Sequence, residues 1–271
     1  MPELPEVETT CRGLEPLVTG RILTGAVVRQ PRLRWRIDPR LAERVAGRPV
    51  TAVERRAKYL LLRLDGPTVI LHLGMSGSLR VVPASTPPAP HDHVDLCLSP
   101  DRVLRLRDPR RFGALFWTSG DPLDHPRLKE LGPEPLGDLF DGAWLASKAA
   151  GRRLAVKPFI MESRVVVGVG NIYASEALHR AAIRPATPAG RLSPARWARL
   201  ATAIREVLAE AIEAGGTTLR DFSGADGRPG YFEQRLAVYG REGEPCPRCG
   251  GTIRRAELGQ RSTFWCPRCQ R

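Results

Sequence analysis

The sequence predicts an α+β protein of several domains: an N-terminal antiparallel β-sandwich or barrel with a flanking helix, then a helical region, then a C-terminal β-hairpin. Three observations support this fold class. Short runs of strand-forming residues fill much of the first half, and Gly, Pro, Asp and Ser separate them without long intervening helices. Apolar residues farther along recur at helical spacing. Two Cys-x-x-Cys pairs lie near the C-terminal end.

A helix is expected directly after the first few residues. Pro5 suits the first turn of a helix, and the acidic Glu6 and Glu8 favour the positive end of its dipole. The apolar residues that follow recur at helical spacing: Val7, Cys11, Leu14 and Val18. This pattern predicts one buried helix face, and it gives Glu6 and Glu8 a structural role.

Strands are expected over residues 59–64, 68–73, 79–82, 94–98, 103–106 and 114–118. Apolar Val94, Leu96 and Leu98 alternate with His93, Asp95 and Cys97, as on a strand with one more deeply buried face. Ahead of these strands, residues 27–36 carry basic side chains among apolar ones: Arg29, Arg32, Arg34 and Arg36.

The second half is expected to be helical. Residues 119–142 are rich in Pro, Gly and Asp, which predicts a linker, and helices are expected from Trp144 onwards and over 171–182. Ser193-Pro194 is an N-cap followed by a first-turn proline, and Gly215-Gly216 ends the helix. Its apolar face is Trp197, Leu200, Ala201, Ile204, Val207, Leu208, Ala211 and Ile212. We therefore divide the chain into residues 1–118, 119–142, 143–242 and 243–271.

The composition favours a polyanionic partner. The 271 residues include 42 Lys and Arg against 29 Asp and Glu, a net charge of +13. Nucleic acid is the first such partner to consider and an anionic membrane surface the second. No apolar stretch reaches the length of a membrane span and no secretory signal precedes the chain, so a cytoplasmic protein is expected.

Four of the six cysteines indicate a metal site. Cys246 and Cys249 form one Cys-x-x-Cys pair, and Cys266 and Cys269 form a second after sixteen residues. This spacing predicts one structural Zn²⁺ held by four thiolates, and disulfides are the less favoured alternative. Many arginines surround these cysteines, which suits phosphate contact better than a solvated zinc ribbon without a ligand. Cys11 and Cys97 are expected to be buried thiols.

The N-terminus offers a possible nucleophile. We expect Met1 to be removed, because a small residue follows it, and this leaves Pro2 with a terminal secondary amine. An α-amino group has a pKa near ~8, so a usable fraction is unprotonated at neutral pH and can form a Schiff base. Glu3 is the adjacent carboxylate for proton transfer. Composition alone gives no preference for this chemistry over a structural role.

Motifs spread over nearly the whole chain resemble the formamidopyrimidine-DNA glycosylase family, bacterial repair enzymes that excise oxidised purines. They are PELPEVE at the start, RRAKYLLL (55–62), HLGMSGSLR (72–80), HDHVDL (91–96), DPRRFG (108–113), GVGNIYASE (168–176), DGRPGYF (226–232) and the cysteine segment. The resemblance implies a helix–two-turn–helix fold for the helical domain and a zinc-ribbon hairpin. It also implies a monomer acting on double-stranded DNA that contains oxidised bases.

The resemblance also implies roles for individual residues. Pro2 attacks the sugar to form a Schiff base, with Glu3 in proton transfer, and β,δ-elimination then cuts the strand. Lys58, Asn171 and Arg261 hold phosphates around the extruded nucleotide. Met75, Arg110 and Phe112 fill the gap that it leaves. Further contacts to DNA are implied for His72, His91, Arg152 and Tyr239, while Lys157 and the glycine-rich loop 217–231 sense or cover the flipped base.

Two other functions remain open. The endonuclease VIII relatives act on oxidised pyrimidines, but they typically begin PEGPE, whereas this chain begins PELPEV after Met1. They also arrange their gap-filling residues differently from Met75, Arg110 and Phe112. A non-catalytic zinc-ribbon DNA-binding protein is the alternative from another class, and retention of Met1 would favour it. His91 and His93 flank Asp92 and suggest a metal, although a surface or DNA-facing role is favoured.

Overall fold

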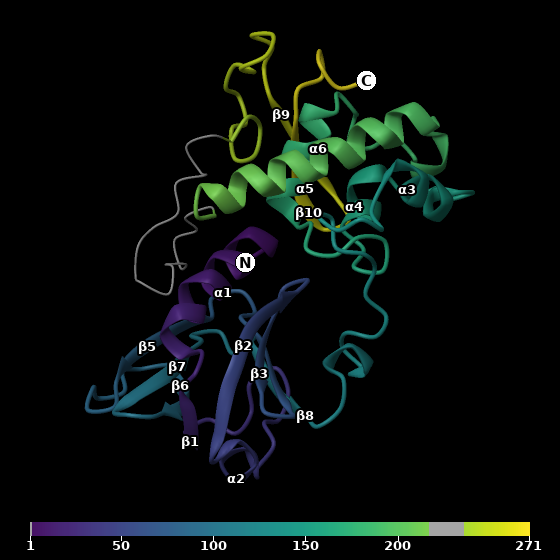
Figure 1. The fold of residues 1–271 in the computed structure, drawn as a ribbon. Coiled ribbons are helices and arrows are strands. Elements are labelled where there is room, and N and C mark those ends of the chain that lie inside the picture. The colour runs from purple at the N-terminus through teal and green to yellow at the C-terminus, as the bar shows by residue number, and fades with distance from the viewer. Residues whose placement is uncertain (1, 217–235) are drawn as a thin grey trace. The chain divides into compact units, whose positions relative to one another are not determined.

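The structure is a computed structural model that describes residues 2–216 and 236–271, in two compact units (Figure 1). Within the described ranges, the first unit comprises residues 2–129 and 215–216, and the second comprises 130–214 and 236–271. Met1 and the lesion-covering loop predicted over 217–231 lie outside the described residues. No helix of the described chain is long and apolar enough to cross a membrane. The four-part domain division stays a prediction.

The first unit is an antiparallel β-sandwich with a helix against it. Its elements are α1 (Leu4–Val18), β1 (Ile22–Val28), α2 (Leu41–Val45), β2 (Arg48–Arg56), β3 (Tyr59–Leu64), β4 (Thr68–His72), β5 (Ser78–Pro83), β6 (Asp92–Leu98), β7 (Arg102–Arg107), β8 (Ala114–Thr118) and the 3₁₀ turn η1 (Pro122–Asp124). The strand order is β5-β7-β6-β1-β2-β3-β4-β8. Only two residue pairs join β1 to β2, so the sheet divides into two four-stranded halves (Figure 1).

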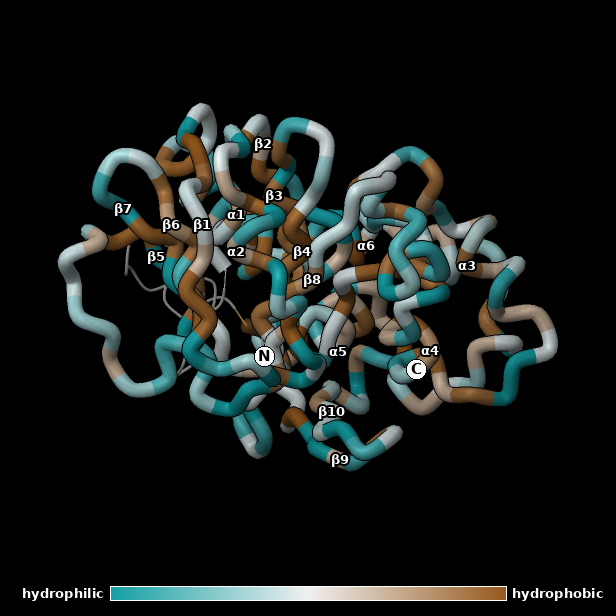
Figure 2. Tube along the Cα trace, turned by 90° about the horizontal axis from the view of Figure 1, so that it is seen from below, coloured by the Kyte–Doolittle hydropathy of each residue, from teal (hydrophilic) through white to brown (hydrophobic). Residues whose placement is uncertain are grey.

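The core of this unit lies between the two halves of the sheet and under α1. It joins Leu96 and Leu104 of one half to Leu62 and Val69 of the other. Figure 2 shows long hydrophobic stretches in β3, β4 and β6, which supply much of this core. The predicted apolar face of α1 is buried throughout: Val7, Cys11, Leu14 and Val18. The six predicted strands are therefore confirmed as β3 to β8, within two residues at each end.

The sequence analysis missed two strands and a short helix. β1 contains Gly25, where the register to β6 shifts, and β2 contains Pro49 and ends in charged residues. Neither has the uninterrupted β-branched pattern that marks a strand. Asp95 also differs from the expected alternation, because it is buried and binds Arg105 through Nε at 2.8 Å.

The two remaining cysteines differ in burial. Burial raises the pKa of the Cys11 thiol to about 12, and its Sγ donates to the Val53 carbonyl at 3.2 Å. Cys97 was expected to be buried, but it is half-buried because alternate residues of β6 face away from the core.

The second unit is helical and ends in a β-hairpin. Its elements are α3 (Gly142–Ala149), α4 (Val156–Ile160), α5 (Asn171–Arg180), η2 (Ala189–Arg191), α6 (Pro194–Glu213), β9 (Arg254–Leu258) and β10 (Arg261–Trp265). The Ser193 side chain accepts from the backbone N–H of Arg196, which confirms the predicted N-cap of α6. The whole predicted apolar face of α6 is buried. Helix α6 packs against α3 and α5, and α5 packs against β10.

Candidate active site and nucleic-acid interface

The N-terminal residues lie at the start of α1. Pro2 is buried, and Glu3 occupies the N-cap position with its side chain almost fully buried. The Glu3 backbone N–H donates to Glu6 Oε2 at 2.8 Å, and Glu6 itself is fully buried. Glu6 therefore fixes the backbone that carries Pro2 and Glu3, because a carboxylate at this position satisfies an N–H that the helix leaves without a partner.

Glu8 links α1 to the turn that carries Lys58. Its carboxylate accepts from Arg12 Nε at 2.9 Å and from Arg55 Nε at 2.7 Å. Partial burial opposes ionisation of Glu8, but the hydrogen bonds from Arg55 and Arg12 outweigh it and lower the pKa of Glu8. Arg55 also donates to the Ala57 carbonyl at 3.1 Å. Lys58 lies in the turn between β2 and β3, next to Ala57 with its φ of +57°.

His72 ends β4 and supports the loop of Met75. The backbone N–H of Gly74 donates to His72 Nδ1 at 2.9 Å, so Nδ1 must be unprotonated and the neutral ring carries its hydrogen on Nε2. Burial lowers the pKa of His72 to about 4, with smaller contributions from the positive charges of Lys58 and Arg34. His72 can therefore donate from Nε2 to a phosphate as a neutral group. Met75 follows in the turn and is half-buried.

Asp108 joins the loop of Met75 to the loop of Phe112. Its fully buried carboxylate accepts from the Gly113 N–H at 2.7 Å and from Ser76 Oγ at 3.2 Å. The two loops also touch directly. A Cβ added to Gly74, which has φ +66°, would lie 2.4 Å from the Phe112 carbonyl carbon. Phe112 itself is 42% exposed. Two loops that are fixed to each other therefore carry an aromatic ring that faces solvent.

The remaining predicted contacts of this unit lie beside Asp108. Arg110 is exposed, and its guanidinium lies 5.0 Å from the ring centre of Phe112. His91 is exposed, and its carbonyl accepts from the Asp108 N–H at 3.0 Å. His93 Nε2 lies 2.9 Å from the Asp108 carbonyl oxygen. The structure thus brings Lys58, His72, Met75, His91, Arg110 and Phe112 to one region of the first unit.

Lys157 is the centre of the cluster in the second unit. Its side chain is completely buried, and Nζ donates to Asn171 Oδ1 at 2.6 Å, to the Ser262 carbonyl at 2.9 Å and to Thr263 Oγ1 at 2.9 Å. Asn171 Nδ2 also lies 3.5 Å from the Tyr239 hydroxyl. The ammonium therefore binds protein oxygens on α5 and β10, which favours a positioning role over contact with a flipped base.

Arg261 and Arg152 are both exposed but differ in their surroundings. Arg261 is the first residue of β10, and it follows Gln260, whose φ is +58° at the tip of the hairpin. Lys157 donates to the carbonyl of Ser262, the residue after Arg261, and so holds the hairpin strand in place. Arg152 follows α3, and its carbonyl accepts from the Gly190 N–H. Within the described chain, the structure shows no side-chain contact between Arg152 and the Lys157 cluster.

Glu176 holds the segment of Tyr239 against α5. Its carboxylate accepts three backbone N–H groups, from Ala237 and Tyr239 at 2.8 Å and from Val238 at 3.0 Å. Burial raises the pKa of Glu176, although these hydrogen bonds oppose the shift. From the sequence, Glu8 was expected only to favour the start of its helix, and Asp108 and Glu176 had no expected role. The only signal was their position inside the quoted motifs or next to them.

The four predicted cysteines form a site that fits one Zn²⁺. Their Sγ atoms all lie within 4.8 Å of one another. Cys246 and Cys269 are 3.9 Å apart and Cys249 and Cys266 are 3.5 Å apart, close to the ~3.8 Å edge of a ZnS₄ tetrahedron with bonds of about 2.3 Å. Among the described residues this is the one cluster of three or more potential metal ligands, so His91, Asp92 and His93 form no such cluster.

Comparisons with known proteins agree with this arrangement. The formamidopyrimidine-DNA glycosylase N-terminal domain matches residues 1–115, and the H2TH domain of the same enzymes matches 131–223. The zinc finger found in FPG and IleRS matches 243–271. Formamidopyrimidine-DNA glycosylases of Alkalilimnicola ehrlichii and Syntrophotalea carbinolica are each 60% identical over 100% of both chains.

Solved structures show the same fold. The MutM (Fpg) protein of Thermus thermophilus is 43% identical with a TM-score of 0.90, covering 99% of this chain and 98% of that one. Lactococcus lactis Fpg bound to DNA containing an abasic site is 33% identical with a TM-score of 0.92, covering 99% of each chain. The fold and the zinc site define a DNA repair enzyme with a structural zinc element. The chain belongs to the formamidopyrimidine-DNA glycosylase family. The predicted family, fold class and structural zinc are thereby confirmed.

Proposed function

We propose that this protein excises oxidised purines, such as 8-oxoguanine and formamidopyrimidines, from duplex DNA and then cuts the strand at the abasic site. The observation that carries the proposal is the start of α1, where buried Pro2 and Glu3 are fixed by the bond from the Glu3 N–H to Glu6. A terminal amine held in this way can meet a sugar carbon without reorganisation. We further infer a monomer that acts in the bacterial cytoplasm.

In the proposed reaction the Pro2 nitrogen attacks C1′ of the damaged nucleotide. The bond from C1′ to the base breaks, and its electron pair leaves with the base, which takes up the proton that the Pro2 nitrogen loses. Glu3 donates a proton to the ring oxygen O4′, the C1′–O4′ bond opens, and an iminium joins Pro2 to C1′. The iminium acidifies the C2′ proton, so β-elimination expels the 3′ phosphate and δ-elimination then expels the 5′ phosphate.

The two loops joined by Asp108 suit the opening of the duplex. A nucleotide that reacts at its sugar carbon C1′ must leave the base stack, and the gap that it leaves in the duplex has to be filled. Met75 and Phe112 replace the lost stacking with apolar surface, while Arg110 reaches acceptors on the orphaned base. His72, His91 and Lys58 lie on the same unit and contact phosphates of the damaged strand.

The second unit supplies the other phosphate contacts. Asn171 and Arg261 bind phosphates beside the extruded nucleotide, and Tyr239 and Arg152 contact the DNA backbone. Lys157 orders Asn171 and the hairpin of Arg261 through its three hydrogen bonds. Zn²⁺ supports the hairpin from its other end and takes no part in the reaction, since four sulfurs fill its coordination shell.

Borohydride trapping tests the proposal. The mature protein is incubated with a duplex containing 8-oxoguanine opposite cytosine, then reduced, and we expect a covalent adduct that maps to Pro2. Pro2→Gly should still bind this duplex but excise at a small fraction of the wild-type rate, since it loses the rigid secondary amine. Pro5→Ala, also in the first turn of α1, is the control and should retain trapping.

Three outcomes contradict the proposal. Excision by Pro2→Gly at the wild-type rate removes Pro2 from the mechanism. Trapping with oxidised pyrimidine but not with 8-oxoguanine instead supports the endonuclease VIII alternative. Binding without any adduct, together with an intact mass that retains Met1, supports a non-catalytic zinc-ribbon protein.

A further inference from the structure

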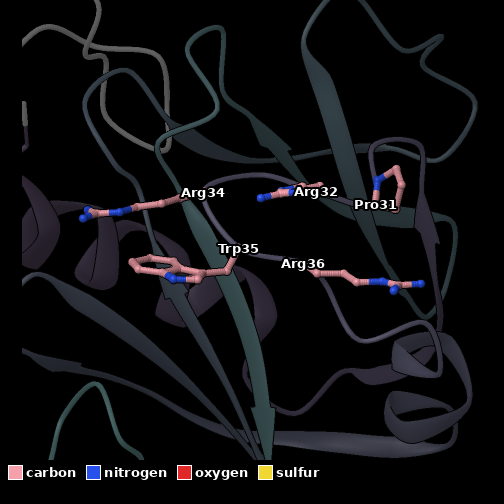
Figure 3. Close-up of a pocket in the computed structure, with 5 residues that line it drawn as sticks. All are labelled: Pro31, Arg32, Arg34, Trp35 and Arg36. Atoms are coloured by element: carbon pink, nitrogen blue, oxygen red, sulfur yellow. The ribbon is translucent and has the colours of Figure 1, made fainter.

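Two adjoining surface hollows on the first unit are lined by arginines. One, of about 410 Å³, is lined by Pro31, Arg32, Arg34, Trp35 and Arg36 (Figure 3). The second, of about 580 Å³, is lined by Gln30, Arg32, Leu33, Arg34, Arg110, Arg111 and Phe112. Because Arg32 and Arg34 line both, the hollows form one continuous basic surface, which we call the arginine groove.

The arginine groove is held in place by buried neighbours and by the Phe112 loop. Leu33 and Ile37 anchor the segment in the core of the first unit. Arg32 and Arg36 pair across an antiparallel bridge, which folds the segment into a tight hairpin. The Arg34 backbone N–H donates to the Gly113 carbonyl at 3.1 Å and so ties the segment to the Phe112 loop.

No carboxylate of the described residues pairs with the positive charge of the groove. The bridge places the backbone of Arg32 opposite that of Arg36, and the two side chains run in opposite directions (Figure 3). Asp38 is the nearest carboxylate along the chain, but it binds Arg44 at 3.0 Å. Across the described ranges, no carboxylate forms an ion pair with Arg32, Arg34 or Arg36. An anion from outside the protein would therefore balance this charge.

Trp35 orients the guanidinium groups of Arg34 and Arg127. Arg34 lies 4.5 Å and Arg127 lies 4.2 Å from the centre of the indole ring, and Phe116 packs against the same ring at 5.6 Å. Figure 3 shows the Arg34 side chain extended along Trp35. Stacking on an aromatic face leaves the N–H edges of a guanidinium available, and this planar fork matches a phosphate.

We propose that Arg32 and Arg34 bind phosphates of the DNA strand opposite the lesion. The proposal rests on the proposed function, in which Arg110 and Phe112 contact the orphaned base. That base belongs to the undamaged strand, and Arg110 and Phe112 line the same hollow as Arg32 and Arg34. In the proposed complex, the phosphates that flank the base would therefore be the anions nearest to this hollow. The groove then holds the undamaged strand while the loops occupy the gap.

The test compares duplex and single-stranded DNA. Arg32→Gln and Arg34→Gln remove charge but keep most of the side chain. Each should lower the salt slope of log Kd for duplex DNA by about 0.9, the value for one lost phosphate contact. Arg102→Gln is the control, because Arg102 is exposed at the end of β7 remote from Asp108 and should change the slope less.

The double variant Arg32→Gln/Arg34→Gln should bind the duplex about 10- to 100-fold more weakly, as expected for two lost phosphate contacts. It should bind a single-stranded oligonucleotide with an abasic site as tightly as wild type does. The rate of borohydride trapping at saturating duplex should also be unchanged, since neither arginine makes or breaks a bond in the proposed reaction.

Three outcomes overturn this assignment. An equal loss on single-stranded and duplex DNA places the arginines on the damaged strand. A loss no larger than that of Arg102→Gln shows that the groove binds no DNA phosphate. Binding of inorganic triphosphate by wild type but not by the double variant, with duplex affinity unchanged, indicates a free polyphosphate site. Failure of the proposed function is distinguishable, because wild type would then form no adduct while the slopes still differed.

Discussion

Replacing Asp108 tests whether the two gap-filling loops are held rigid before DNA binds. Asp108→Ala leaves the Gly113 N–H and the Ser76 hydroxyl without their buried acceptor. A hydroxyl can rotate towards another acceptor, but the backbone N–H cannot. The bond from the Gly113 N–H to the carboxylate contributes about 1.5–3 kcal/mol, and the Ser76 hydroxyl, which recovers part of its bond elsewhere, adds about 1 kcal/mol. We therefore expect a loss of about 2–4 kcal/mol in the free energy of opening these loops.

Amide hydrogen exchange at Gly113 measures this opening directly. A loss of about 2–4 kcal/mol corresponds to exchange that is faster by about 30- to 1,000-fold, at 1.4 kcal/mol for each factor of ten. Asp108→Asn should cost only about 1 kcal/mol, since the amide oxygen can still accept from Gly113. Asp65→Ala removes an exposed carboxylate from the turn between β3 and β4 and serves as the control.

The functional consequence should be confined to duplex substrates. Excision of 8-oxoguanine from duplex DNA should fall with Asp108→Ala, while cleavage of a single-stranded abasic site should persist, because a single strand has no gap to fill. Unchanged Gly113 exchange in Asp108→Ala would refute the bridging role. Equal losses on both substrates would show general damage to the unit instead.

Three further perturbations test other parts of the site. Because the pKa of His72 is about 4 in the folded protein and ~6.5 in an unfolded chain, the unfolded state takes up the proton first on acidification. The contribution of neutral His72 to the free energy of unfolding is fully present above about pH 6.5. It is lost as pH falls towards 4, by up to about 3 kcal/mol. The free energy of unfolding of His72→Gln, measured with urea, should lack this part of the pH dependence. Removing Zn²⁺ with a chelator should abolish duplex binding while β-sandwich amides keep their exchange protection, and full binding by verified apo-protein would contradict this. Lys157→Met should weaken binding to 8-oxoguanine and abasic duplexes equally, by about 10- to 100-fold, because it removes the charged hydrogen bonds that position Asn171. Weaker binding to the 8-oxoguanine duplex alone would instead indicate that Lys157 contacts the base.

Local patterns in the sequence were sufficient for elements whose partners are near in sequence. The N-cap Ser193 and the apolar face of α6 are set within one helix, and the Cys-x-x-Cys spacing sets the zinc site within one hairpin. Asp95 shows where this reasoning ends. Its alternation with Val94 and Leu96 predicted the less buried face of the strand, but the register of β6 against β7 places Arg105 beside it and Asp95 is buried. The register between two strands cannot be read from the sequence pattern of either strand.

The same limit applies to the candidate site. Pro2, Met75, Arg110 and Arg261 were selected because they match family motifs, and a motif identifies the residues without showing what holds them in position. The groups that hold them come from distant parts of the chain. Asp108 binds Ser76, 32 residues before it, and Lys157 binds Thr263, 106 residues after it. These pairings depend on the folded chain, so the sequence alone gave no reason to choose Asp108 or to place Lys157 inside the protein.

Buried charged side chains hold the backbone beside three of the proposed DNA-contact residues. Asp108 supports the loop of Phe112, Lys157 supports the strand of Arg261, and Glu176 supports the segment of Tyr239. A neutral surface loop exchanges its hydrogen bonds with water at little net cost, whereas a buried charge loses several kcal/mol if its partners leave. The backbone that carries each proposed contact residue is therefore held in place without DNA. If these residues contact DNA as proposed, less binding energy is lost to ordering loops.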